Sequence, residues 1–259
     1  MALFDMKYHS DALGVGVSVY VVLPEKAKTL IGMKADGGST YKTLYLFHGL
    51  SDDHSIWLRR TSIERYAAEW GIAVVMPAVG RSWYTDKPNG EKYLTFVTEE
   101  LPNVCRNFFR GMSDKREDTL VAGLSMGGYG AIKAALTAPE RFGACASLSG
   151  ALDIADTCER RHWKDEMLLL FGVSKSDELY GSAHDIYHLA KENAAEGKPF
   201  PKLYLWCGEG DPRFVYSRRF DTLLSELGVE HVYEESEGDH SWQWWDLHIR
   251  SAMKYLLGK

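Results

Sequence analysis

Short, mainly apolar runs recur along the chain, and each gives way to a glycine, a proline or a polar loop. Runs bounded in this way are typical of buried β-strands. Five of them are residues 43–47, 72–76, 118–122, 141–150 and 202–207. An earlier run, residues 14–23, alternates apolar and small residues up to Pro24, which predicts an antiparallel strand, and residues 231–233 predict a short last strand.

Segments with helical character separate these runs. They are residues 62–70, 93–109, 128–136, 217–227 and 244–257. Pro102 is expected to interrupt or restart the second of them. Strands that alternate with helices over this length predict a mostly parallel central sheet with helices on both faces, an α/β fold.

Residues 151–200 break this alternation and look mainly helical, so they form either a cap over a site or ordinary packing. No linker, repeat or low-complexity tract divides the chain. We therefore expect a single domain over residues 1–259, with a small helical insertion at 151–200.

The segment Ala122–Ala131 carries the strongest chemical signal. Its Gly123, Ser125 and Gly127 fit the Gly-x-Ser-x-Gly pattern of a nucleophile elbow, a sharp turn from a strand into a helix that exposes a serine hydroxyl. Glycine is expected on both sides because a Cβ there would collide with the neighbouring strand or helix. The alternatives are a glycine-rich turn without chemistry and a dinucleotide-binding loop, although the latter lacks its third glycine and its acidic partner.

A second glycine-containing loop, His48–Asp53, follows the strand at 43–47. In α/β hydrolases a loop at this place supplies one backbone N–H of the oxyanion hole, and the residue after the nucleophile supplies the other. Those donors would be Leu50 and Met126. The alternative is an ordinary strand-to-helix turn.

A serine nucleophile needs a base within hydrogen-bond reach and a carboxylate that orients this base. In the α/β-hydrolase fold the three groups follow the chain order serine, acid, histidine. Asp211 follows the strand at 202–207 and His240 follows the last strand, so both are expected at the same sheet edge as Ser125. This candidate triad requires no cofactor. The competing acids are Asp153 and Asp239, and the competing bases are His48, His231, His184 and His188.

Aromatic residues are candidates for substrate binding. Trp83 and Tyr84 follow a strand, at the sheet edge where open α/β sheets bind ligands, so they either wall a pocket or pack on the surface. Trp242, close to His240, is a further candidate, as are Trp57 and Trp163. Such rings stack on sugars or phenolic groups, although tryptophans also fill cores.

His184 and His188 offer a metal site as an alternative. Histidines at this spacing share a helix face and can bind zinc, but the metallopeptidase pattern requires glutamate where this chain has Asp185. A third ligand is not evident either. We therefore predict no metal site.

Composition narrows the classes further. The 259 residues carry a formal net charge of −6 without a clustered basic segment, so a nucleic-acid partner is not expected. The four scattered cysteines are predicted to be buried free thiols. Charged residues at positions 5–11 argue against a signal peptide, and no run is long enough to span a bilayer, so we expect a cytoplasmic protein without a membrane partner.

Five segments together resemble the esterase D-like carboxylesterases, in particular the small tributyrin esterases, which are related to S-formylglutathione hydrolases and to acetylxylan and feruloyl esterases. The segments are Tyr45–Leu50, Met76–Asp86, Ala122–Ala131, Ser147–Gly150 and Gly238–Trp242. The resemblance covers nearly the whole chain and implies the α/β-hydrolase fold, the triad and the oxyanion donors named above, and a homo-oligomer. Gly210 and Pro212, around the candidate acid, depart from the pattern.

Three functions remain open from the sequence. The first is a serine carboxylesterase for short-chain acyl esters, including acetyl or feruloyl esters of plant oligosaccharides. The second is a thioesterase of the S-formylglutathione type, which shares the same chemistry. The third, from another class, is a non-catalytic carbohydrate-binding relative. Acyl transfer to an acceptor other than water also stays open, because it depends on the shape of the pocket.

Overall fold

The computed structural model describes residues 1–25 and 39–258, which contain one eight-stranded sheet. The strands are β1 (Ala2–Ser10), β2 (Val15–Leu23), β3 (Thr43–Phe47), β4 (Ala73–Pro77), β5 (Thr119–Leu124), β6 (Ala144–Leu148), β7 (Lys202–Gly208) and β8 (His231–Ser236). Their order across the sheet is β1-β2-β4-β3-β5-β6-β7-β8. β2 runs antiparallel to both of its neighbours, and the pairs from β4 to β8 are parallel. The predicted α/β-hydrolase architecture is therefore confirmed.

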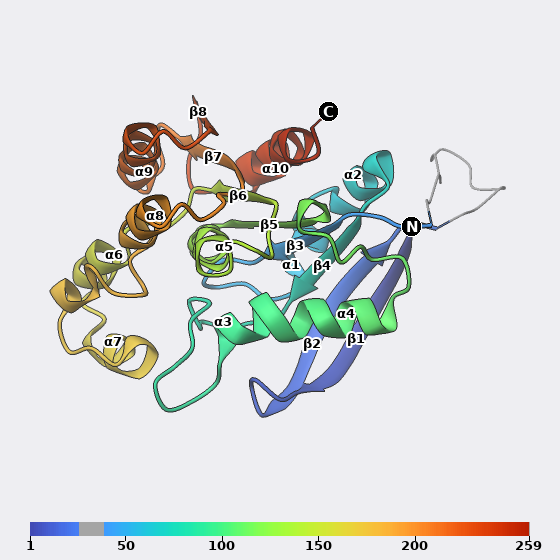
Figure 1. Cartoon of the computed structure of the whole chain (residues 1–259), viewed down its shortest axis with the longest axis horizontal. Helices are drawn as coiled ribbons and strands as arrows, with labels where there is room; N and C mark the ends of the chain where they lie inside the picture. Colours follow the sequence, from blue (N-terminus) through green and yellow to red (C-terminus); the bar gives the residue numbers. More distant parts are fainter. Residues whose placement is uncertain (26–38, 259) are drawn as a thin grey trace.

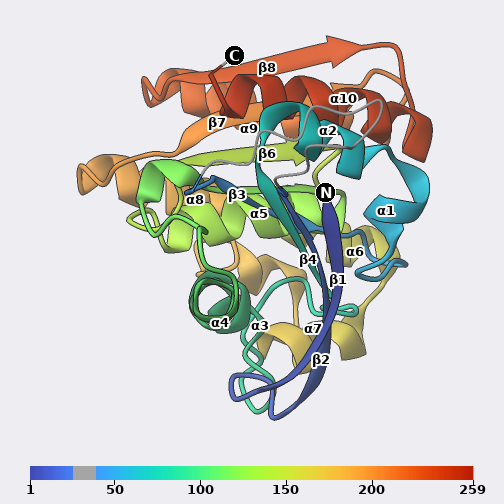
Figure 2. The ribbon, with the colours of Figure 1, turned by 90° about the vertical axis from the view of Figure 1, so that its right-hand side faces the viewer.

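Helices cover both faces of the sheet (Figures 1 and 2). They are α1 (Ile56–Arg60), α2 (Ile63–Trp70), α3 (Tyr93–Thr95), α4 (Leu101–Phe108), α5 (Met126–Thr137), α6 (Ile154–Arg161), α7 (Lys164–Phe171), α8 (Ile186–Ala195), α9 (Phe214–Glu226) and α10 (Trp242–Leu256). Helices α1, α2 and α10 bury side chains against one face, and α4 to α9 against the other. Successive residues of β3 enter the two cores alternately, as the pleat of a strand requires.

The central helix, α5, is buried from Met126 to Leu136. Its glycines allow this close packing: a Cβ on Gly128 would lie 2.6 Å from the Ser147 hydroxyl, and one on Gly130 would lie 2.2 Å from the Tyr84 ring. Because α5 is held this firmly, the residue that precedes it has a fixed position relative to the sheet.

Strand β1 was not expected from the sequence. It lies at the edge of the sheet and pairs with β2 alone. Most of its side chains are exposed or half-buried, with polar Asp5, Lys7 and His9 among them. Residues 4–9 alternate apolar and polar side chains, and Met6 and Tyr8 pack partly against the core, so the sequence does carry a strand signal here that we missed.

The other departures concern the ends of elements. The segment 93–109 stays helical through Pro102, because a π-helical turn at Phe96–Glu100 joins α3 to α4 and the proline lies in the first turn of α4. Strand β8 continues to Ser236, and α10 begins at Trp242 rather than at residue 244.

Residues 151–200 contain α6, α7, α8 and a 3₁₀ turn at Ser176–Leu179, so the insertion is helical as expected. Helix α8 packs on α5, and the Asn193 side-chain amide donates a hydrogen bond of 2.7 Å to the Leu136 carbonyl. Its role as a cap stays a prediction.

Two further expectations concern burial and hydropathy. All four cysteines are buried and free, as predicted. Within residues 1–25 and 39–258, no helix combines the length and the apolar character that crossing a membrane requires.

Candidate active site

Ser125 lies between β5 and α5, where the chain turns sharply. Its φ of 53° and ψ of −116° are unusual for a residue with a side chain. Two backbone hydrogen bonds hold this conformation: the Ser125 N–H donates to the Leu148 carbonyl at 3.0 Å, and the Ala151 N–H donates to the Ser125 carbonyl at 3.1 Å. The strand, strained serine and helix together form the nucleophile elbow that the sequence predicted.

The two glycines that flank the serine are sterically required. A Cβ on Gly123 would lie 2.3 Å from the Gly127 carbonyl oxygen, and a Cβ on Gly127 would lie 2.5 Å from that of Phe47. The second contact also shows how closely the elbow approaches the end of β3. The nucleophile therefore lies directly beside the loop that follows β3.

The structure brings the three candidate triad residues together. His240 Nε2 lies 3.0 Å from Ser125 Oγ, and His240 Nδ1 lies 2.8 Å from Asp211 Oδ2. The Asp211 side chain is fully buried, and its other oxygen accepts a 2.7 Å hydrogen bond from the Arg213 backbone N–H. A buried carboxylate on Nδ1 keeps the proton on that nitrogen, so Nε2 is free to accept the serine proton.

Contact between two loops produces this alignment. The Gly210 N–H donates a 2.9 Å hydrogen bond to the Gly238 carbonyl, and a Cβ on Gly208 would lie 2.5 Å from the same group. Gly210, which departs from the family pattern, thus lies where the loop after β7 touches the loop after β8. Pro212 is exposed in the turn that leads into α9. Neither residue disturbs the approach of Asp211 to His240.

The competing acids and bases have other partners. Asp153 caps α6 by accepting a 2.9 Å hydrogen bond from the Asp156 N–H, and Asp239 is exposed and bonds Ser241. His231 Nε2 lies 2.9 Å from an Asp221 carboxylate oxygen. None of these contacts involves Ser125.

His48 orders the loop that would supply an oxyanion donor. Its imidazole is buried and bridges two backbone groups: Nδ1–H donates to the Gly49 carbonyl at 2.7 Å, and Nε2 accepts from the Val79 N–H at 3.1 Å. Burial lowers the pKa of His48 to about 4, so the ring is neutral at pH 7. Tyr84 adds a 3.0 Å hydrogen bond to the His48 carbonyl.

Leu50 and Met126, the predicted oxyanion donors, flank the nucleophile. Leu50 lines the same cavity as Ser125, and Met126 is the next residue along the chain. Within the part of the chain that the structure describes, neither backbone N–H has a hydrogen-bond acceptor. Both groups are therefore available to a bound oxyanion.

The cavity around Ser125 has a volume of about 520 Å³. Its lining comprises Gly49, Leu50, Ser51, Asp52, Arg81, Leu124, Ser125, Arg161, His240, Ser241, Trp242 and Trp245. Trp242 is thus where the sequence placed it. Arg81 and Arg161 were not anticipated, because an isolated arginine in a loop or at a helix end carries no pattern.

Trp245 was also missed, although it lies three residues after Trp242 and therefore on the same side of α10. Its ring meets the His240 imidazole edge-on, with centroids 4.9 Å apart, and its Nε1–H donates to the Ser149 hydroxyl at 3.0 Å. This indole packs against the imidazole and is itself anchored by Ser149, so it helps to orient His240.

Trp83 and Tyr84 do not line the cavity, and their placement there was wrong. Both are buried, at 2% and 0% exposure. Tyr84 stacks on Phe47 at 4.5 Å, and Trp83 meets the rings of Tyr129 and Trp163 edge-on, each at 5.7 Å. Both backbones adopt positive φ, near 50°, which turns these side chains into the core.

His184 and His188 make separate contacts. His184 precedes α8 and lies beside the buried amine of Lys133, with 3.0 Å between Nδ1 and Nζ, while His188 Nε2 lies 3.1 Å from a Glu192 oxygen. Within residues 1–25 and 39–258, no group of three or more metal-ligating side chains converges. Because His184 lies before the first residue of α8, the two histidines do not share a helix face.

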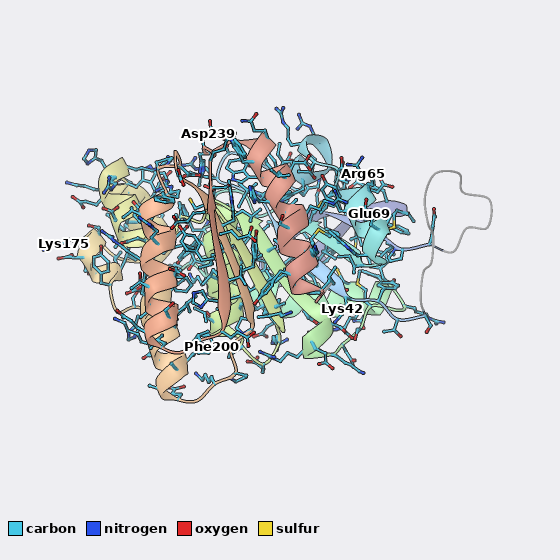
Figure 3. The ribbon with its side chains drawn as sticks, turned by 90° about the horizontal axis from the view of Figure 1, so that it is seen from above. Lys42, Arg65, Glu69, Lys175, Phe200 and Asp239 are labelled. Atoms are coloured by element: carbon cyan, nitrogen blue, oxygen red, sulfur yellow. The ribbon has the colours of Figure 1, made fainter. Side chains whose placement is uncertain are left out.

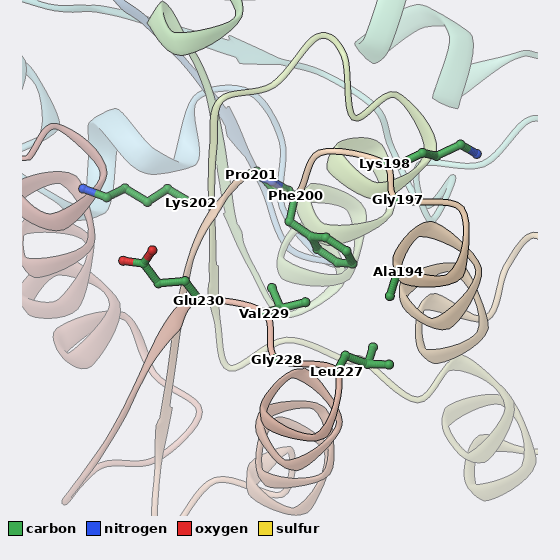
Figure 4. Close-up of a pocket in the computed structure, with 10 residues that line it drawn as sticks. All are labelled: Ala194, Gly197, Lys198, Phe200, Pro201, Lys202, Leu227, Gly228, Val229 and Glu230. Carbon is green, nitrogen blue, oxygen red and sulfur yellow. The ribbon is translucent and has the colours of Figure 1, made fainter.

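A separate surface depression of about 480 Å³ lies at the other end of β7 (Figure 4). Figure 3 labels Phe200, which lines it, and Asp239, the neighbour of His240, at opposite ends of the sheet. None of the candidate site residues borders this depression.

Comparison with known proteins agrees with this geometry. A family model described as "Putative esterase" matches residues 10–256. An acetyl esterase of Caldicellulosiruptor saccharolyticus is 31% identical over 99% of this chain and 98% of its own length.

Two solved structures from Staphylococcus aureus share the whole fold. The fluorophosphonate-binding serine hydrolase FphF is 34% identical, with a TM-score of 0.88 over 100% of this chain and 99% of its own. The S-formylglutathione hydrolase FrmB is 33% identical, with a TM-score of 0.84 over 99% and 98%. The resemblance inferred from the motifs is thereby confirmed, and the chain belongs to the esterase family of serine hydrolases.

Proposed function

We propose that this protein is a serine carboxylesterase that hydrolyses short-chain acyl esters through an acyl-enzyme on Ser125. One observation carries the assignment: a continuous hydrogen-bonded chain from Ser125 Oγ through His240 to the buried carboxylate of Asp211. The serine end of this chain opens into the 520 Å³ cavity, a volume within the usual range for small-molecule sites.

The geometry gives each group a role. Ser125 Oγ attacks the ester carbonyl while His240 Nε2 takes its proton, and Asp211 orients the imidazole and stabilises its charged form. The Leu50 and Met126 N–H groups donate to the oxyanion, each lowering the barrier by about 3 kcal/mol. His240 then passes the proton to the leaving alcohol. In the second half of the reaction His240 takes a proton from water, which attacks the acyl-enzyme and releases the carboxylic acid.

The similarity to an acetyl esterase over nearly the whole chain favours small acyl groups. The equally similar S-formylglutathione hydrolase supports thioester hydrolysis as a second candidate. One ferulic acid esterase shares the fold at 20% identity and another at 15%, so a feruloyl substrate rests on the motif resemblance.

The test is hydrolysis of p-nitrophenyl esters from acetate to decanoate, with methyl ferulate and S-formylglutathione alongside, by the wild type and Ser125→Ala. We expect acetate and butyrate esters to react fastest and the variant to lose nearly all activity. A fluorophosphonate probe should label the wild type only. An inert, unlabelled wild type would favour the carbohydrate-binding alternative, and full activity in Ser125→Ala would refute the elbow as the nucleophile.

Self-association is part of this proposal because the family resemblance implies a homo-oligomer. Light scattering on the protein as it leaves a size-exclusion column measures the mass of the assembly directly. A mass near 29 kDa, that of one chain, would contradict it.

A further inference from the structure

Two arginines line the cavity that contains the nucleophile. Arg81 lies in the loop after β4, and Arg161 ends α6 in the insertion. The chain as a whole is acidic, with 36 acidic against 30 basic residues. Positive charge at the one cavity that holds Ser125 therefore does not follow from composition.

A single indole places both guanidinium groups. The Arg161 Cζ lies 4.9 Å and the Arg81 Cζ 5.6 Å from the centre of the Trp163 ring, both within the range of cation–π attraction. Trp163 is itself anchored edge-on to the buried Trp83. The two cations thus share one aromatic contact, although they belong to segments eighty residues apart in the chain.

The surrounding carboxylates leave one cation without a partner. Arg81 pairs with Glu166 at 2.9 Å, and Asp52 also lines the cavity, where burial raises its pKa. Within residues 1–25 and 39–258, no carboxylate lies within 4.0 Å of Arg161. Its neighbour Arg160, by contrast, pairs with Asp156 at 2.6 Å and does not line the cavity.

A third arginine, Arg213, lies close enough to Arg161 for their positive charges to repel each other. Arg213 is half-buried, and its Nε has no hydrogen-bond partner among the described residues. The charge of Arg161 acts on it strongly enough to contribute, after burial, to lowering the Arg213 pKa. An anion bound at Arg161 would relieve this repulsion.

Resting on the proposed esterase function, we propose that the enzyme prefers esters that carry an anionic group, and that Arg161, assisted by Arg81, binds this group. The charged group can belong to the acyl part or to the alcohol part of the ester. A carboxylate is the simplest form of it, because guanidinium groups bind carboxylates through paired hydrogen bonds.

The experiment compares each anionic ester with a neutral ester of the same shape. For the acyl part, monomethyl glutarate is compared with methyl 4-carbamoylbutanoate; for the alcohol part, 4-acetoxybenzoate is compared with 4-acetoxybenzamide. Acid release is followed in a pH-stat at low ionic strength. The readout is the ratio of kcat/KM for the anion to kcat/KM for the amide, which cancels general effects of a substitution on catalysis.

We expect a ratio above one for at least one pair in the wild type, and a fall of about fivefold in Arg161→Gln, as loss of one partly exposed ion pair implies. Arg161→Lys should retain part of the preference. The matched control Arg160→Gln should keep the wild-type ratio, and 0.5 M salt should reduce the ratio because it screens exposed charges.

Ratios at or below one for both pairs, or an unchanged ratio in Arg161→Gln, would overturn the inference. p-Nitrophenyl acetate separates this failure from failure of the proposed function. If that neutral ester is hydrolysed, the esterase assignment stands and only the anion preference falls; if it is not, the assignment itself falls.

Discussion

The buried amine of Lys133 should make stability depend on pH in a defined direction. Lys133 lies in the middle of α5 with 1% exposure, and its Nζ contacts Thr85 Oγ1 at 2.9 Å and His184 Nδ1 at 3.0 Å. Burial lowers the pKa of Lys133 from 10.5 to about 7, against the smaller opposing effect of Asp86. Burial also lowers the pKa of His184 to about 3, so this ring is a neutral acceptor.

The sign follows from proton counting. Between pH 7 and 10.5 the unfolded chain keeps the Lys133 proton while the folded protein has released it. The unfolded state binds more protons in this window, so stability rises with pH. At lower pH both states hold the proton, and burying the charge costs the fold about 5 kcal/mol. From pH 7 to pH 9 about 2 kcal/mol of that cost is recovered.

The assay is urea unfolding of the wild type and Lys133→Met at pH 7, 8 and 9. The cysteine thiols are buried in the folded state and titrate near pH 9 once either protein unfolds. The difference in unfolding free energy between the wild type and Lys133→Met cancels this effect and isolates the lysine. We expect the wild type to gain about 2 kcal/mol relative to Lys133→Met over this range. Lys191→Met, at an exposed position on α8, is the matched control and should parallel the wild type. Parallel pH profiles for the wild type and Lys133→Met would refute a neutral buried amine.

Three further substitutions test the site and its support. Asp211→Asn should lower kcat by about 10⁴-fold because the imidazole loses its correct tautomer, with an unchanged circular dichroism spectrum; a fall below tenfold would remove Asp211 from the triad. Gly127→Ala places a Cβ 2.5 Å from the Phe47 carbonyl, so we expect a loss of about 3 kcal/mol in urea unfolding, and unchanged stability would contradict the steric requirement. Tyr84→Phe removes the hydrogen bond to the His48 carbonyl and should cost about 1 kcal/mol of stability and lower kcat severalfold with little change in KM; equal loss in kcat and gain in KM would point to substrate contact instead.

The core of the fold could be predicted from the sequence because its strands are buried on both faces. Such strands read as continuous apolar runs, and the loops that follow parallel strands meet at one edge. Ser125 and Asp211 follow two such strands, β5 and β7, and His240 follows the half-buried edge strand β8 beside β7, so their convergence needed only the strand order. Competing acids could not be excluded in this way, because Asp153 also follows a strand and only its cap on α6 shows its role.

The aromatic residues after β4 could not be placed from the sequence, because their direction depends on the backbone. Trp83 and Tyr84 adopt positive φ, a conformation that side chains rarely adopt and that no residue pattern reveals. The neighbouring Arg81 reaches the cavity instead. Its role depends on Trp163, eighty-two positions later, and a contact of that range is invisible to local periodicity.

The residues that line the cavity come from two parts of the chain, one that carries the chemistry and one that selects the substrate. Ser125 and Leu50 lie in the turns that follow β5 and β3, whereas Arg161 and its supporting indole come from the insertion after β6. Exchange of that insertion between two related enzymes should therefore transfer the choice of ester while the acylation machinery stays intact. Evolution can then diversify substrates by altering one peripheral segment, without remaking the strained turn on which bond cleavage depends.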